Sequence, residues 1–106
     1  MNHEGDVSIE VSSRHGEVSD RMADYARQKA GRLPRFNDQI SRIEVVVDGP
    51  HDAPEVEVVC HVDNHEHVVG KDKSEHFHSA LDGAVQKVER QLVKAKERLK
   101  DHRGEG

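Results

Sequence analysis

The chain has 106 residues, of which 33% are hydrophobic and 35% charged, and its formal net charge at pH 7 is −5. A chain of this length buries roughly 65% of its unfolded surface in one small core, which excludes a second domain, and its periodic apolar residues exclude extensive disorder. No run approaches the ~18 apolar residues of a membrane span, and the acidic stretch at Met1 does not resemble a signal peptide, so we expect a cytoplasmic protein.

The first third of the chain predicts a strand and a helix. Val7, Ile9 and Val11 alternate with polar residues, as in a strand with one buried face. Ser19 is a typical N-cap, and Pro34 cannot continue a helix, so we predict a helix between them. Its apolar side carries Met22, Tyr25, Ala26 and Leu33.

Three further strands follow. Alternating apolar residues, ending at the turn residues Asp48-Gly49-Pro50 and Asp63-Asn64, predict the second and third strands, and residues 68–72 predict a shorter fourth one. Their apolar positions are Ile43, Val45 and Val47, then Val56, Val58, Cys60 and Val62. Cys60 is the only cysteine, so an internal disulfide is excluded and a buried thiol is expected. The opposite face should carry Glu55, Glu57, His61 and Asp63.

A long amphipathic helix, capped by Ser74, is predicted for the last third. Its buried positions are Phe77, Leu81, Ala84, Val85, Val88, Leu92, Ala95 and Leu99. On a helical wheel, one flank carries Lys87, Arg90, Lys94 and Arg98, and the other carries Lys96, Lys100 and Arg103. No acid lies three or four residues from Lys87 or Arg90, so the helix presents two basic edges.

The element order β-α-β-β-β-α defines an α+β fold. A strand, helix and strand at this spacing favour a right-handed crossover between parallel strands, and the later short turns favour antiparallel neighbours. We therefore predict a four-stranded mixed sheet with both helices packed on one face. Residues 6–102 should form the single domain, with flexible tails at 1–5 and 103–106.

The charge is distributed by region. Residues 86–103 contain seven Lys/Arg against three Asp/Glu, and residues 19–35 contain five against two. Residues 36–85 contain three against eleven, so both helices are basic while the strands are acidic. This pattern predicts a polyanionic partner that is met on one side only. A basic helix end that is merely solvated remains the simpler alternative.

Several motifs resemble those of a known family. They are Ala80-Leu81-Asp82-Gly83, Lys87, Arg90-Gln91-Leu92 and residues 94–100, together with Val18-Ser19, Lys29, Arg32-Leu33 and Phe36. The chain resembles the ribosome hibernation promoting factors, also called ribosome-associated inhibitor A or protein Y, of the sigma-54 modulation family. The likeness covers residues 7–102. It departs from the family pattern in its acidic central strands, in Pro34 and in its many histidines.

The resemblance implies a protein that binds the small ribosomal subunit, alone or in the whole ribosome, at the decoding centre. There it would occupy tRNA and messenger positions without catalysing a reaction. The implied contacts to 16S rRNA phosphates are Lys29, Arg32, Lys87, Arg90, Lys94, Lys96, Arg98 and Lys100. The chain looks like a short form without the dimerisation domain of long members, so we expect a monomer off the ribosome. No cofactor, small-molecule substrate or membrane is implied.

Other interpretations remain. Lys29 lies within the apolar arc of its helix, so its stem could simply snorkel at the core edge instead of contacting phosphate. Nine histidines invite a metal-binding function, but none of their spacings matches a structural zinc site. An enzyme is disfavoured because no phosphate loop or nucleophile elbow is present. A general module for double-stranded RNA is the main alternative.

Overall fold

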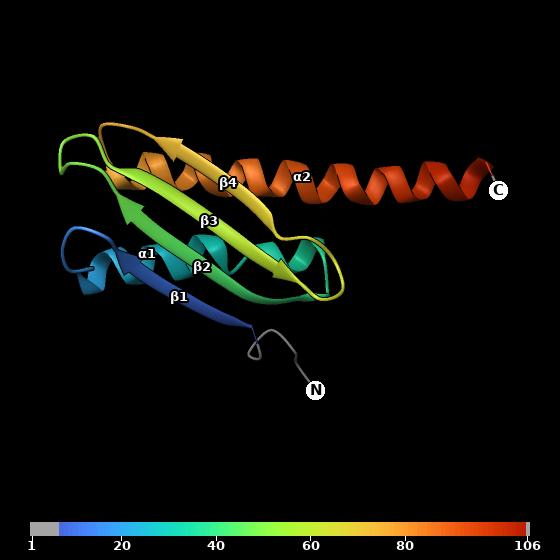
Figure 1. The fold of residues 1–106 in the computed structure, drawn as a ribbon, viewed down its shortest axis with the longest axis horizontal. Coiled ribbons are helices and arrows are strands. Elements are labelled where there is room, and N and C mark those ends of the chain that lie inside the picture. Colours follow the sequence, from blue (N-terminus) through green and yellow to red (C-terminus); the bar gives the residue numbers. More distant parts are fainter. Residues whose placement is uncertain (1–6, 106) are drawn as a thin grey trace.

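The computed structural model describes the backbone of residues 7–105 and the side chains of residues 7–97. Its elements are β1 (Ser8–Ser13), α1 (Asp20–Ala30), the 3-10 helix η2 (Leu33–Phe36), β2 (Ile40–Asp48), β3 (Glu55–Val62), β4 (Val68–Lys73) and α2 (Phe77–Glu105). The strands form one sheet in the order β1-β2-β3-β4, and both α-helices lie behind it in Figure 1. The predicted α+β fold is confirmed. The predicted N-terminal tail lies outside the described residues.

The strand pairing follows from the connections. β1 and β2 are parallel, with Ile9 opposite Ile43, because α1 carries the chain back across one face of the sheet. β2 with β3 and β3 with β4 are antiparallel, since short turns join them. Gly49 has φ +82° in the first of these turns, a conformation that glycine adopts without a steric penalty. Asn64 has φ +66° in the second turn.

The core lies between the sheet and the helices. Alternate residues of β2 and β3 point toward the helices, and the hydrophobic residues that fill this space are all buried. The fully buried large side chains are Leu33, Ile43, Val45, Val56, Val58, Cys60, Leu81 and Val88. On the opposite face Glu55, Glu57 and His61 are half-buried and Asp63 is exposed, as the alternation predicted.

The predicted end of the first helix is wrong. α1 ends at Ala30, and Leu33 belongs to η2, in which Pro34 occupies the first turn. Pro34 has no N–H with which to continue the hydrogen bonds of α1, and the chain tightens earlier, where the Arg32 N–H donates to the Lys29 carbonyl at 3.3 Å. Leu33 nevertheless reaches the core and is fully buried.

The predicted cap at Ser74 is also wrong. α2 begins at Phe77, so His76 precedes its first residue. The Ser74 N–H instead donates to the Pro54 carbonyl at 3.2 Å, which extends the pairing of β3 and β4. The chain must leave this ladder before a helix can start, and the helix therefore begins two residues later than a cap at Ser74 predicts.

α2 is longer than the sheet that it covers. Its 29 residues span about 44 Å, and its C-terminal part continues beyond the strands in Figure 1. Ala95, which the helical wheel places on the buried side, is therefore exposed. The side chain of Leu99, predicted to be buried, lies outside the described part. Within residues 7–105, neither α-helix is both long and apolar enough to cross a membrane.

Candidate nucleic-acid interface

The two predicted basic residues of the N-terminal half lie at the C-terminal end of α1. Arg32 follows the helix and is exposed, whereas Lys29 is half-buried. The Lys29 ammonium lies 5.4 Å from the centroid of the Tyr25 ring, within the range of a cation–π contact. The stem of Lys29 thus packs along an aromatic ring while its charge stays at the surface, as the snorkelling alternative describes, and the phosphate contact stays a prediction.

Tyr25 also joins the two helices. Its hydroxyl donates to the Asp82 carboxylate of α2, with oxygen–oxygen distances of 2.9 and 3.1 Å, although the residues are 57 positions apart. The ring meets His78 edge-on at a centroid distance of 4.1 Å. Partial burial and the Asp82 carboxylate both raise the Tyr25 pKa, so the hydroxyl keeps its proton and remains a donor. This contact therefore links α1, which carries Lys29, to α2, which carries the two basic flanks.

We expect Tyr25→Phe to reduce the free energy of unfolding by about 1 kcal/mol, because Asp82 loses its hydroxyl partner while the ring contacts remain. The urea midpoint measures this change. Asp82→Asn keeps an acceptor for the hydroxyl and should cost less. Equal midpoints for Tyr25→Phe and the parent protein would contradict a stabilising role for the contact.

The first basic flank of α2 runs beside β4. The Lys87 ammonium donates to the Lys71 carbonyl at 2.7 Å and lies 3.6 Å from an Asp72 carboxylate oxygen. Its acid partner therefore comes from a strand, which helical spacing alone could not reveal. Arg90 and Lys94 are exposed and form no ion pair within the described part. The Arg98 side chain lies outside that part.

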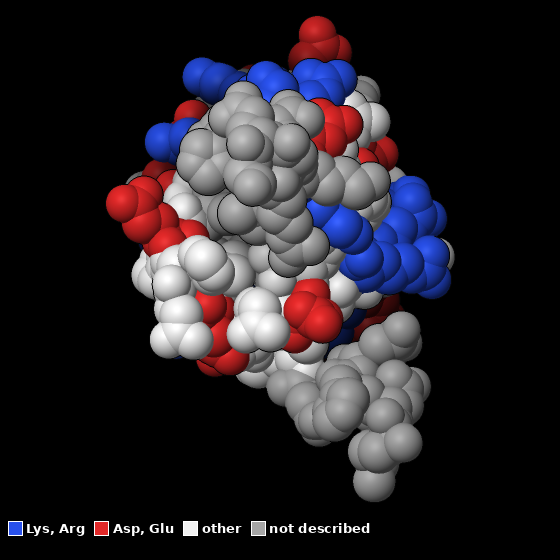
Figure 2. Space-filling view, turned by 90° about the vertical axis from the view of Figure 1, so that its right-hand side faces the viewer, with Lys and Arg blue, Asp and Glu red and all other residues white. Residues whose placement is uncertain are grey.

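The second basic flank faces η2. Lys96 lines two hollows together with Arg35 and Phe36, so the helix layer gathers a lysine and an arginine from segments about 60 positions apart in sequence. Arg35 was not among the predicted contacts, because nothing in the sequence places it beside α2. The Lys100 and Arg103 side chains lie outside the described residues. Figure 2 shows Lys and Arg gathered in two places at this end of the molecule, at the top and on the right.

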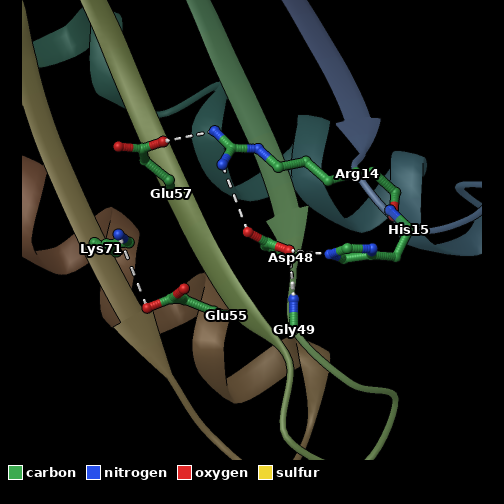
Figure 3. A network of polar contacts seen from close by, with 8 residues as sticks. Arg14, His15, Asp48, Gly49, Glu55, Glu57 and Lys71 are labelled. Carbon is green, nitrogen blue, oxygen red and sulfur yellow. Dashed lines mark hydrogen bonds and ion pairs between the residues drawn. The ribbon is translucent and has the colours of Figure 1, made fainter.

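The open face of the sheet is different, because most of its acids are paired. Arg14 lies 3.5 Å from Asp48 and 3.8 Å from Glu57, and Lys71 lies 3.9 Å from Glu55 (Figure 3). Arg42 lies 3.0 Å from Glu10 and 3.7 Å from Glu44. The acidity of the strands is therefore partly neutralised by cations from the same face, which the count by sequence segment did not show.

Two carboxylates on this face have lowered pKa values. The hydrogen bond from His61 lowers the pKa of Glu44, and the Gly49 N–H, 2.8 Å from the Asp48 carboxylate, lowers the pKa of Asp48. A carboxylate whose pKa falls on folding stabilises the native state above its unfolded pKa. That stabilisation is lost as the pH falls through the lower, folded value.

We therefore expect the stability of the protein to fall below about pH 4.5, the ordinary value for a glutamate. Urea midpoints between pH 7 and pH 3 measure the loss. Glu44→Gln should lower the urea midpoint at pH 7. It should also make the midpoint depend less steeply on pH in the acid range, because glutamine does not titrate. If the urea midpoints of Glu44→Gln and of the parent protein are the same at every pH, the contact between Glu44 and His61 does not contribute to stability.

The described histidines are not gathered into a metal centre. Within the described residues, no group of three or more His, Cys, Asp or Glu side chains could hold a metal ion. The His61 ring lies 4.0 Å from that of His67 and contacts Glu44 through Nε2. Cys60 faces the core, and burial raises its thiol pKa to about 12, so it is a poor nucleophile at neutral pH.

Comparison with known proteins identifies the family. Residues 9–100 match the family described as Sigma 54 modulation protein / S30EA ribosomal protein, and the chain belongs to this family. The ribosome hibernation promoting factor of Azotobacter vinelandii is 30% identical over 92 residues, covering 87% of this chain and 85% of the relative. That of Klebsiella oxytoca is 25% identical over 96 residues, covering 91% of this chain and all of the relative.

Solved structures share the fold. The N-terminal domain of Thermus thermophilus Protein Y aligns with a TM-score of 0.73 at 24% identity, over 82% of this chain and 97% of that domain. A ribosomal subunit interface protein from Coxiella burnetii aligns with a TM-score of 0.76 at 19% identity, over 85% of this chain and 98% of that one. At these identities the similarity establishes the fold, and the predicted family and topology are both confirmed.

Proposed function

We propose that this protein is a ribosome-associated translation regulator that binds 16S rRNA at the decoding centre of the small subunit. By occupying the decoding centre it would exclude tRNA and messenger RNA, without catalysing a reaction. The family and the names of the relatives support ribosome association. The proposal also includes a cytoplasmic location and a monomeric state off the ribosome.

The observation that carries the proposal is the contrast between the two faces of the molecule. Basic residues on the sheet are mostly paired with acids, whereas those on the helix layer, apart from Lys87, form no ion pair within the described part. Among them are the predicted phosphate contacts Arg32, Arg90, Lys94 and Lys96, all of them exposed. Such cations supply affinity for phosphates without reading base sequence, which suits recognition of a groove lined by folded RNA.

The first experiment is co-sedimentation of the protein with separated small subunits, large subunits and empty ribosomes, at low and moderate salt. We expect saturable binding to small subunits and whole ribosomes that weakens as salt rises and is blocked by bound tRNA and messenger. Binding to large subunits alone would overturn the proposal. Equal competition by free duplex RNA would favour the general RNA-binding alternative.

A further inference from the structure

A groove lies at the end of the sheet, beneath the part of α2 that extends past the strands. It has a volume of about 750 Å³, and its apolar lining comes from η2, β3, β4 and α2. The apolar lining residues are Pro34, Phe36, Val62, Val68, Leu92 and Ala95. Phe36 is half-buried, and it is one of only three aromatic residues in the chain. The groove is large enough for a small planar ligand.

The rim of the groove is polar and carries opposite charges on different segments. Arg35 and Lys96 line it together with the acids Asp38 and Glu66, and all four side chains are exposed. The same Arg35 and Lys96 also line a neighbouring hollow of about 320 Å³, where Val93 is 38% exposed. Arg35 and Lys96 therefore lie between the groove and the neighbouring hollow, both of which are partly apolar.

We infer that this groove binds an unpaired nucleobase of RNA, with the adjoining phosphates held by Arg35 and Lys96. The inference rests on the proposed function, and it adds to it a pocket for a single base. The base would lie against Phe36 and the aliphatic side chains, and its amino groups could donate to the carboxylates of Asp38 or Glu66.

An RNA base suits the groove better than an apolar peptide does. Proteins that bind single-stranded RNA combine aromatic side chains, on which bases stack, with cations that hold the backbone. Carboxylates accept hydrogen bonds from base amino groups, as from cytosine N4. A purely apolar peptide would leave Arg35 and Lys96 without a phosphate or other anion. The groove also adjoins the exposed cations of the helix layer, so one RNA strand could contact both.

The test compares single-stranded RNA hexamers of each base with an abasic hexamer of the same charge and with duplex RNA. Binding to the full chain is measured by titration, and the Phe36 ring and Ala95 methyl are followed by NMR. We expect at least one base-containing hexamer to bind about fivefold or more tightly than the abasic one, and to shift both signals. Equal affinities, or shifts that leave Phe36 and Ala95 unaffected, would overturn the inference.

Ala95→Phe fills the groove from an exposed helical position without changing charge. It should remove the preference for base-containing RNA while leaving affinity for the abasic hexamer unchanged. Ser79→Phe adds the same ring at an exposed position near the start of α2 and should retain the preference. If Ala95→Phe misfolds, the comparison of hexamers with the unmodified protein still tests the inference, because it needs no variant.

The outcomes separate the inference from the proposed function. If the protein binds small subunits but does not distinguish the hexamers, the groove inference fails and the proposed function stands. If it distinguishes the hexamers but binds no subunit, the ribosomal function fails and a single-stranded RNA site remains. If an apolar peptide shifts Phe36 and Ala95 and RNA does not, the groove is a protein-binding site and the inference is wrong.

Discussion

Arg90→Glu combined with Lys94→Glu should reduce affinity for the small ribosomal subunit on the order of 10²-fold or more. Each charge-assisted contact to phosphate contributes about 1.5–3 kcal/mol, and the new carboxylates would repel the RNA. The salt dependence should weaken too, by about 0.7–0.9 in logarithmic slope for each lost phosphate contact. Co-sedimentation across a salt series measures both effects.

The pair Arg90 and Lys94 separates binding from folding better than a pair that includes Lys87. Lys87 contacts the Lys71 carbonyl and Asp72, so its reversal would disturb the docking of α2 on β4. Arg90 and Lys94 lie one helical turn apart and repel each other in the parent protein. Two glutamates at these positions repel each other to a similar extent, so the double substitution adds little strain to the helix. Thermal melting should therefore change little.

The matched control is Lys71→Glu with Lys73→Glu on the open face of the sheet. It changes the net charge by the same amount but leaves the helix layer intact. We expect this variant to bind within a few-fold of the parent. Equal loss of binding in both double variants would mean that net charge matters and that the helix layer is not the interface.

Gly70→Ala should destabilise the protein by about 1–3 kcal/mol. Gly70 is buried in β4 where α2 crosses it, and an added Cβ would lie 2.3 Å from the Ala84 carbonyl oxygen and 2.8 Å from a Val88 methyl. The helix would have to move away from the sheet to relieve these contacts. For a domain of this size we expect the melting temperature to fall by roughly 5–20 °C.

Gly16→Ala is the control for this effect. A Cβ at Gly16 would have no atom within 4 Å, so the melting temperature should stay within a few degrees of that of the parent. If Gly70→Ala proves as stable as Gly16→Ala, α2 does not pack against β4 as closely as described. Loss of subunit binding by Gly70→Ala would reflect displacement of α2, since Gly70 is buried and has no side chain to contact RNA.

The strands and their pairing could be predicted because period-two alternation and turn residues are local signals. Val45, Val58 and Cys60 were expected in the core and are buried there. The ends of the helices were less predictable, because they depend on competition between segments. Ser74 is a good cap by itself, yet its N–H pairs with Pro54, and Leu33 has the right spacing for α1 but lies in η2.

The basic character of the helices could also be predicted, but their contacts could not. Helical spacing describes neighbours along one helix, whereas Lys87 finds its acid on β4, and Tyr25 finds Asp82 at a distance of 57 positions. The groove was missed for the same reason. Its lining comes from four segments, and it exists because α2 extends past the end of the sheet, which no residue pattern specifies.

The contacts of α2 with β4 also bear on how copies of this protein behave in concentrated solution. β4 is an edge strand, and unpaired carbonyl groups on such an edge can recruit a strand from another molecule. Gln91 Nε2 donates to the Val69 carbonyl at 2.6 Å, and Lys87 occupies the Lys71 carbonyl, so two such positions are already taken. The helix thereby blocks part of the β4 edge against pairing with a strand of another molecule, and Lys87 of the first basic flank contributes one of the two blocking contacts.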